Sequence, residues 1–238
     1  MKAVRKSARA PRIPIKRNAK ATKAKILAAA IAEFGERGLA AARTDDIAER
    51  CGVNKRMIYY YFDSKEGVYL AALEAVFEKL VALEQLIDVD HLEPPAAIEA
   101  MVNLKINYYV ENPSFVSFLS MENFHQARHL RQSKKLDLFR TPLTDVIGRI
   151  LKRGQRNGQF RKDVEAVDFY ISLCALCIMY FSNQHTLGAI FGRDMTSTAS
   201  IKRRKRTVVD LVLRYLQADS TASVKRWKKA GGYVSLVS

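Results

Sequence analysis

The stretch NKRMIYYYF, residues 54 to 62, sets three consecutive tyrosines between two basic residues and a phenylalanine. Successive residues of a helix point about 100° apart, so three adjacent tyrosine rings cannot all face one core. Ile58 and Phe62 lie four residues apart and form the natural inward pair of such a helix. The residues farthest from that inward face are then Arg56, Met57 and Tyr60. We therefore expect a helix whose outer face carries basic and aromatic side chains.

The segments before this stretch predict two more helices. Between residues 22 and 37 apolar side chains recur at helical spacing, and Gly38 provides a stop. Thr44 can cap a second short helix that runs to Cys51, and Asn54 can cap the helix of the tyrosines. Two short helices joined by a glycine-containing turn, here at Gly52, are typical of the helix-turn-helix motif.

The outer face of the third helix suits the major groove of DNA. In a helix-turn-helix motif the second helix enters that groove, and residues near its start contact base edges. Arg56 can bind guanine through two hydrogen bonds, and Lys55 can reach a base or a phosphate. Tyr59 and Tyr61, on the two flanks, can donate hydrogen bonds to phosphate oxygens. The alternative is a tyrosine-rich seam packed against a neighbouring helix.

The longer segment ILAAAIAEFGERGLAAARTDDIAERCGVNKRMIYYYFDSKEGVYLAAL, residues 26 to 73, resembles the DNA-binding domain of the TetR family of bacterial transcriptional regulators. The resemblance covers about residues 22 to 70. The matching features are Ala30 and Phe34, Gly38, Thr44, Ile47-Ala48, Gly52-Val53, Ile58-Tyr59, Phe62 and Ser64-Lys65-Glu66.

The resemblance implies two kinds of DNA contact. Its phosphate contacts are Thr44, Tyr59 and Lys65. Its residues that face bases or the groove wall are Lys55, Arg56, Tyr60 and Tyr61. Arg43, Asn54 and Met57 complete the predicted DNA-binding set. The pair Arg56-Met57 departs from the family, where small residues are common, so a phosphate contact from a small hydroxyl is lost there.

The charge of the chain is concentrated at its ends. The net charge is +16, and residues 1 to 25 hold ten bases and no acid, whereas residues 26 to 80 hold seven bases and nine acids. We expect a basic disordered arm over residues 1 to 21 that adds DNA affinity with little sequence discrimination and steepens its salt dependence. A solubilising tail and a transit peptide are the alternatives. Residues 219 to 238 are predicted to form a basic C-terminal tail.

The remainder of the chain predicts an all-α protein. The DNA-binding domain is placed at residues 22 to 66 and a larger helical domain at residues 67 to 218. Asp63 with Glu66 resembles a capping box that starts a fourth helix running toward Ile87. The further predicted helices lie near 96–111, 114–130, 142–156, 164–187 and 199–217. Asn112-Pro113, Arg140-Thr141-Pro142 and Asn157-Gly158 separate them.

The resemblance further implies that the larger domain forms a homodimer and binds a small effector. The dimer is expected through the helices near 164–187 and 199–217. The effector is unknown, and the aromatic residues of the middle helices suit an apolar or aromatic one. The expected effector-binding residues are Phe118, Met121, Glu122, His125, Phe169 and Tyr180. Ordinary core packing is the alternative for each of them.

Two polar groupings suggest other chemistry. Glu122, His125 and His129 would share a helix face and could bind a metal, although solvated helices often carry such residues by chance. Cys174 and Cys177 have C-x-x-C spacing within an apolar run, which favours buried structural thiols over a zinc or redox site. No catalytic motif is present, so we expect no enzyme, no cofactor and no metal.

Together these patterns predict a dimeric transcriptional repressor that a small-molecule effector releases from a palindromic operator. No stretch is long and apolar enough to span a bilayer, so we expect a cytoplasmic protein without a membrane partner. The alternatives are a DNA-coating or partner-binding protein without an effector, and a regulator that responds to redox state or metal.

Overall fold

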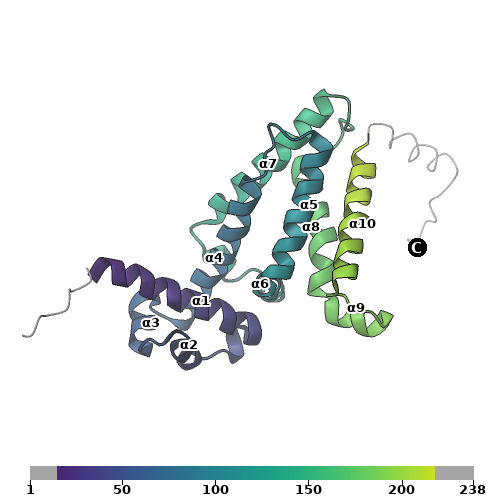
Figure 1. The fold of residues 1–238 in the computed structure, drawn as a ribbon. Coiled ribbons are helices and arrows are strands. Elements are labelled where there is room, and N and C mark those ends of the chain that lie inside the picture. The colour runs from purple at the N-terminus through teal and green to yellow at the C-terminus, as the bar shows by residue number, and fades with distance from the viewer. Residues whose placement is uncertain (1–14, 218–238) are drawn as a thin grey trace, which may run out of the picture. The chain divides into compact units, whose positions relative to one another are not determined.

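A computed structural model describes residues 15–217, with side chains from residue 19 onward except at 141 and 143. Over this range the chain forms ten α-helices and one short 3-10 helix, and it has no strand beyond an isolated bridge between Phe160 and Gln217 (Figure 1). The all-α prediction is confirmed. The predicted C-terminal tail and the first fourteen residues of the predicted arm lie outside the described residues.

The chain divides into two compact units, Met1–Ala72 and Leu73–Ser238. The division falls inside one continuous helix, α4 (Lys65–Gln85). The sequence placed the boundary six residues earlier, between 66 and 67, at the start of that helix. Each unit has its own buried core.

The first unit contains α1 (Ile15–Ala41), α2 (Thr44–Cys51), α3 (Lys55–Phe62) and the first two turns of α4. Helix α1 begins at Ile15, seven residues before the predicted start, so the later part of the predicted disordered arm is helical. At Gly38 the backbone leaves the helical region (φ 72°, ψ 172°), which confirms the predicted stop because glycine tolerates positive φ.

The predicted caps of α2 and α4 are corrected by one residue each. Thr44 is the first residue of α2, and Arg43 occupies the cap position without a side-chain hydrogen bond. At α4 the Ser64 hydroxyl accepts a hydrogen bond from the Gly67 amide at 2.9 Å, which makes Ser64 the cap in place of Asp63. Asp63 instead adopts a positive φ of 64° and forms the turn that leads into the cap.

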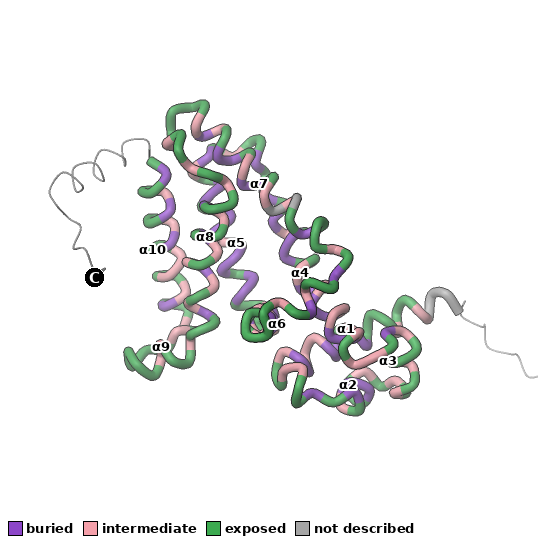
Figure 2. The backbone as a smooth tube through the Cα atoms, turned by 180° about the vertical axis from the view of Figure 1, so that it is seen from behind, coloured by how far each residue is buried: buried purple, intermediate pink, exposed green. Residues whose placement is uncertain are grey.

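The second unit contains the rest of α4 and the helices that follow it. These are α5 (Pro94–Glu111), α6 (Pro113–Phe124), a 3-10 turn (Leu130–Gln132), α7 (Leu136–Arg156), α8 (Ala166–Ser182), α9 (Gln184–Phe191) and α10 (Thr198–Leu216). Helix α5 packs against α6, α7, α8 and α10, and half of its residues are buried (Figure 2). It is therefore the centre of the unit, and the other helices are arranged around it.

Three predicted helix boundaries are wrong. Helix α6 ends at Phe124 rather than 130, because Gln126 and Ala127 adopt positive φ. Helix α7 starts at Leu136 and runs through Pro142, which removes one helical hydrogen bond without ending the helix. The predicted helix 164–187 is two helices, since the chain bends by 67° between α8 and α9.

A buried polar cluster joins three helices of this unit. The Lys105 ammonium of α5 is fully buried and forms an ion pair with Glu84 of α4, which is also buried. The Tyr170 hydroxyl of α8 accepts a hydrogen bond from Lys105 at 2.9 Å and donates to Glu84 at 3.1 Å. Burial raises the pKa of Tyr170, so its hydroxyl stays protonated and remains a donor. Each charge is thus paired, as burial of charge requires.

No single described helix is long and apolar enough to cross a membrane. Helices α8 and α9 pass that test only when they are taken together across their bend.

Replacing Lys105 with Met tests the buried cluster. The change leaves the Glu84 carboxylate buried without its ion-pair partner, so we expect it to lower the free energy of unfolding by about 3–5 kcal/mol. The double variant Lys105→Met, Glu84→Leu removes both charges and should recover most of that loss. Urea denaturation followed by helical circular dichroism measures both, and equal destabilisation of the two variants would contradict the account.

Candidate DNA-binding surface

Two buried side chains hold α3 in place within the first unit. Ile58 is fully buried and Phe62 nearly so, as the spacing of four predicted. The tight turn from α2 uses Gly52 at φ 64°, and the Val53 amide donates to the Ala48 carbonyl at 3.1 Å. Asn54 caps the helix through a 2.9 Å hydrogen bond from the Arg56 amide to its side chain, as predicted.

The opposite face of α3 is exposed. The Tyr60 side chain is 74% exposed, and Arg56 is exposed one turn before it. The Tyr60 and Tyr61 rings meet edge to face with centroids 5.1 Å apart. This arrangement excludes a seam in which all three tyrosines pack against one described helix, because Tyr60 projects into solvent.

A second group of predicted contact residues gathers where α2 begins. The Thr44 and Tyr59 hydroxyls lie 3.2 Å apart, with Tyr59 exposed and Thr44 buried beside it. The Lys55 ammonium contacts Asp45 at 2.9 Å, and this hydrogen bond raises the pKa of Lys55. Arg43 is exposed and lies 3.9 Å from the same carboxylate. The side chains are thus held at one edge of the surface.

Two other predicted contact residues, Lys65 and Met57, lie outside this group. Lys65 donates to the Ala40 carbonyl at 3.3 Å, at the start of α4 and away from the Thr44–Tyr59 pair in sequence. Met57 is half-buried. The structure therefore brings Arg43, Thr44, Lys55 and Tyr59 together at one edge, while Arg56 and Tyr60 form the exposed centre of α3.

Ion pairs that the sequence pattern did not predict fix α1 to α2. The Glu33 carboxylate of α1 is fully buried and lies 3.3 Å from both Arg37 and Arg50. Arg50 of α2 also contacts Glu36 of α1 at 2.5 Å. The only sequence signal for these ion pairs is that Glu33 lies next to the inward-facing Phe34. A glutamate is rarely buried unless it is paired with a cation. Asp45, which holds Lys55, was also missed.

The six residues predicted to bind an effector occupy different places in the second unit. Phe118 is fully buried, Met121 is half-buried and His125 is exposed. The Phe169 ring stacks on Tyr215 with centroids 6.2 Å apart, and Tyr180 lies under the Arg204 guanidinium at 5.4 Å. Glu122 accepts hydrogen bonds from the Nδ1 of His129 at 2.9 Å and from the Leu130 amide at 2.9 Å. Tyr180 lines a cavity beside Phe191 and Arg204 to which the other five do not contribute.

A cavity of about 470 Å³ lies between helices near these residues. The Tyr109 ring of α5 and the Phe181 ring of α8 form part of its wall, with centroids 5.9 Å apart. Its lining is Tyr109, Val110, Pro113, Val116, Ser117, Ser120, Phe181, Ser182, Gln184, His185, Thr196 and Ile201. Such a mixture of aromatic walls and a few hydroxyls suits a small apolar or aromatic molecule.

The described residues offer no support for a metal or redox site. Because α6 ends at Phe124, His125 and His129 do not share a helix face with Glu122. No group of three or more metal-ligating side chains occurs between residues 15 and 217. Burial raises the pKa of the Cys177 thiol to about 12, which leaves it protonated and unreactive.

Comparison with known proteins covers both units. A family model described as bacterial regulatory proteins of the tetR family matches residues 26–72, and one described as a tetracyclin repressor-like C-terminal domain matches residues 94–212. The HTH-type transcriptional repressor NicS of Pseudomonas putida is 33% identical over 196 residues, which is 82% of this chain and 92% of NicS.

Two further relatives extend the comparison. The HTH-type transcriptional repressor SCO4008 of Streptomyces coelicolor is 28% identical over 200 residues, which covers 82% of this chain and 98% of that protein. A solved tetR-family regulator from Rhodococcus RHA1 shares the fold with a TM-score of 0.63 at 20% identity, covering 83% of this chain and 97% of the other.

Alanine substitutions on the two faces of α3 should differ sharply in their effect on stability. Ile58→Ala opens a cavity in a sealed core, so we expect a loss of about 2–5 kcal/mol. Tyr60→Ala removes an exposed ring, so we expect a change within about 0.5 kcal/mol. Thermal unfolding of both variants measures this difference. A large loss for Tyr60→Ala would show that its ring is a packing residue after all.

Proposed function

Because the chain belongs to the TetR family of bacterial regulatory proteins, which are DNA-binding transcriptional regulators and not enzymes, we propose that it acts as a repressor. In this proposal a homodimer binds a palindromic operator and a small effector releases it. The relatives NicS and SCO4008, both named as transcriptional repressors, support repression over activation. The observation that carries the proposal is the exposed basic and aromatic face of α3 opposite its buried pair.

The DNA contacts follow from the positions of the side chains. Arg56 stands in the first turn of α3, where a recognition helix meets base edges, and its guanidinium suits guanine. The exposed Tyr59 hydroxyl suits a phosphate oxygen on one groove wall, and the buried Thr44 hydroxyl beside it can orient that tyrosine. Lys55 shares its positive charge with Asp45, and its remaining N–H donors can contact a base or a phosphate.

An apolar stripe on α8 and α10 supports the homodimer. Val167, Ile171 and Met179 repeat at multiples of four along α8 and are exposed. On α10 the exposed Leu211 and Tyr215 are also four residues apart. Exposed apolar rows at helical spacing are typical of a helix–helix interface, and a two-fold pairing would present two recognition helices to a palindrome.

The 470 Å³ cavity is the proposed effector site, in place of the six residues named from the sequence. A ligand there lowers DNA affinity only if it binds better to a state that binds DNA less well. Helix α4 joins the two units along the chain, and Glu84 near its end is tied to α5 and α8 by the buried cluster. Rearrangement of α5 or α8 around a ligand would therefore act on α4.

Arg56→Gln tests the base contact. With a duplex that the intact protein selects from a random pool, we expect the binding free energy to weaken by about 1–3 kcal/mol, roughly a five- to 150-fold loss of affinity. Binding to a scrambled duplex should change little. Arg128→Gln, an exposed arginine of the second unit, is the control for lost charge. Fluorescence anisotropy measures the affinity of each variant for each duplex. If Arg56→Gln weakened binding to both duplexes equally, the result would favour a DNA-coating protein.

Ile171→Asp tests the homodimer. The Ile171 side chain is 59% exposed, so the substitution should leave the fold of one chain intact. Placed in an interface it buries an unpaired carboxylate, and we expect the dimer dissociation constant to rise roughly tenfold or more. Leu138→Asp, at a 65% exposed position on α7, is the matched control. Analytical ultracentrifugation reads the assembly state, and a dimer unaffected by Ile171→Asp would refute the α8 interface.

A further inference from the structure

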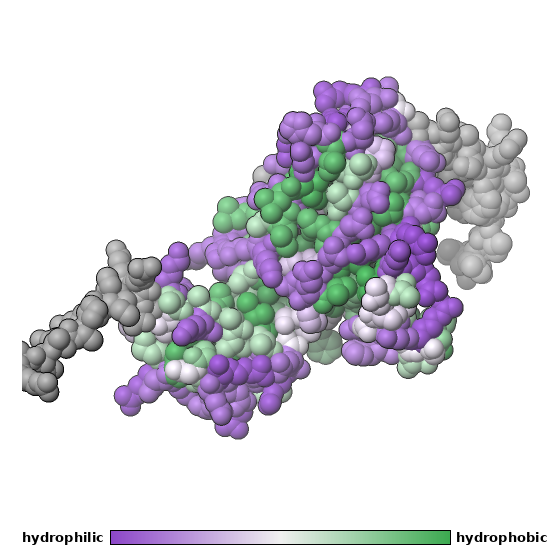
Figure 3. Space-filling view, in the orientation of Figure 1, coloured by the Kyte–Doolittle hydropathy of each residue, from purple (hydrophilic) through white to green (hydrophobic). Residues whose placement is uncertain are grey.

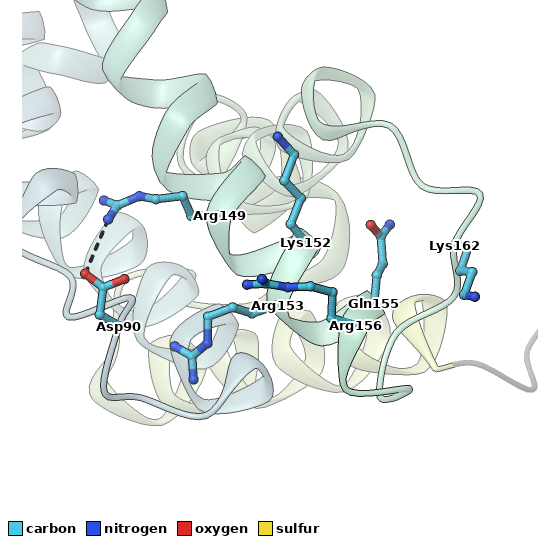
Figure 4. Close-up of a pocket in the computed structure, with 7 residues that line it drawn as sticks. All are labelled: Asp90, Arg149, Lys152, Arg153, Gln155, Arg156 and Lys162. Atoms are coloured by element: carbon cyan, nitrogen blue, oxygen red, sulfur yellow. Dashed lines mark hydrogen bonds and ion pairs between the residues drawn. The ribbon is translucent and has the colours of Figure 1, made fainter.

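A groove of about 600 Å³ lies along the last two turns of α7 and is lined mainly by basic side chains (Figure 4). Its lining is Asp90, Arg149, Lys152, Arg153, Gln155, Arg156 and Lys162. Five of these seven residues are cations and one is an acid. The groove belongs neither to the proposed DNA-binding surface nor to the proposed effector cavity.

The cations are gathered by the helical repeat. Arg149, Lys152, Arg153 and Arg156 occupy positions i, i+3, i+4 and i+7 of α7, so one face of the helix carries all four (Figure 4). Lys162 comes from the loop beyond Gly158, which turns the chain with a φ of 72°. Hydrophilic side chains cover this end of the second unit (Figure 3).

Most of this charge is not neutralised by described residues. Arg149 contacts Asp90 at 3.5 Å, and Arg153 donates to the uncharged carbonyl of Val89. Lys152, Arg156 and Lys162 form no ion pair within residues 15–217. Two other cations of the unit are paired, since Lys135 contacts Glu74 and Glu78 at 3.0 and 2.7 Å and Arg140 contacts Asp137 at 2.7 Å. The start of α10 also carries exposed cations, among them Lys202 and Arg206, but these do not line the groove.

Crowding of like charges destabilises this helix face. Cations three and four residues apart repel each other, at roughly the strength with which opposite charges at that spacing attract. The negative C-terminal end of α7 favours cations in its last turn, which accounts for Arg153 and Arg156. It does not account for Arg149 and Lys152, one turn earlier. A bound anion would relieve the repulsion among all four.

We propose that this groove binds a small molecule that carries several phosphate groups. Guanidinium groups make paired hydrogen bonds to phosphate, and two of the three here are already oriented by the loop at Val89 and Asp90. No aromatic side chain lines the groove, so a base or other ring would find no stacking partner. The phosphates themselves are therefore the recognised group.

Calorimetric titration of the full chain with tripolyphosphate tests the proposal at near-physiological salt. We expect saturable binding that the double variant Lys152→Gln, Arg156→Gln weakens roughly tenfold or more. The control Lys202→Gln, Arg206→Gln removes the same two residue types at the same spacing from exposed positions of α10. Its affinity should match that of the intact chain, and circular dichroism confirms that both variants are folded.

Three results would overturn the proposal. Absence of saturable binding would show that the groove does not recognise phosphate groups. Equal weakening by the two double variants would show attraction to overall charge. If Lys152→Gln, Arg156→Gln also reduced affinity for a scrambled duplex, the groove would be a DNA contact and not a small-molecule site.

Discussion

The burial of Ile58 and Phe62 is the constraint on which the proposed DNA-binding surface depends. Two inward side chains four residues apart fix the rotation of a helix about its own axis. Once they are buried, Arg56 and Tyr60 must face solvent, and Tyr59 must lie beside Thr44 at the edge. The ion pairs of Glu33 with Arg37 and Arg50 then hold α1 and α2 as the frame for that helix.

In the second unit the corresponding constraint is polar. An ion pair and two hydrogen bonds link Lys105, Glu84 and Tyr170 inside an apolar core. Helices α4, α5 and α8 each contribute one of these three side chains, and each side chain bonds to the other two. Sliding α4 past either neighbour would leave a charge buried without a partner, at a cost of several kcal/mol or about half of a typical protein's stability. We therefore expect α4 to adopt discrete positions against α5 and α8 and not a continuous range of them. A regulator needs such discrete states in the helix that joins its two units.

Local sequence patterns predicted much of the fold and only part of the proposed sites. Apolar spacing and glycine stops located α2 and α3 and the end of the first helix at Gly38, because these features act within a few residues. The end of α6 was missed because Gln126 and Ala127 adopt a conformation that usually requires glycine. The cavity at Tyr109 and Phe181 joins helices distant in sequence, so no local pattern could reveal it. Asp45 was overlooked for the same reason, since Lys55 lies ten residues away.

Selection from a pool of randomised duplexes at near-physiological salt tests the central claim most directly. If a dimer presents two copies of α3, the intact protein will enrich one palindrome whose half-sites lie about one helical turn, roughly 10 base pairs, or a multiple of it apart. Enrichment of a single unpaired half-site would contradict the dimer. Failure to enrich any sequence would contradict the assignment of Arg56 and Tyr60 as a base-reading surface.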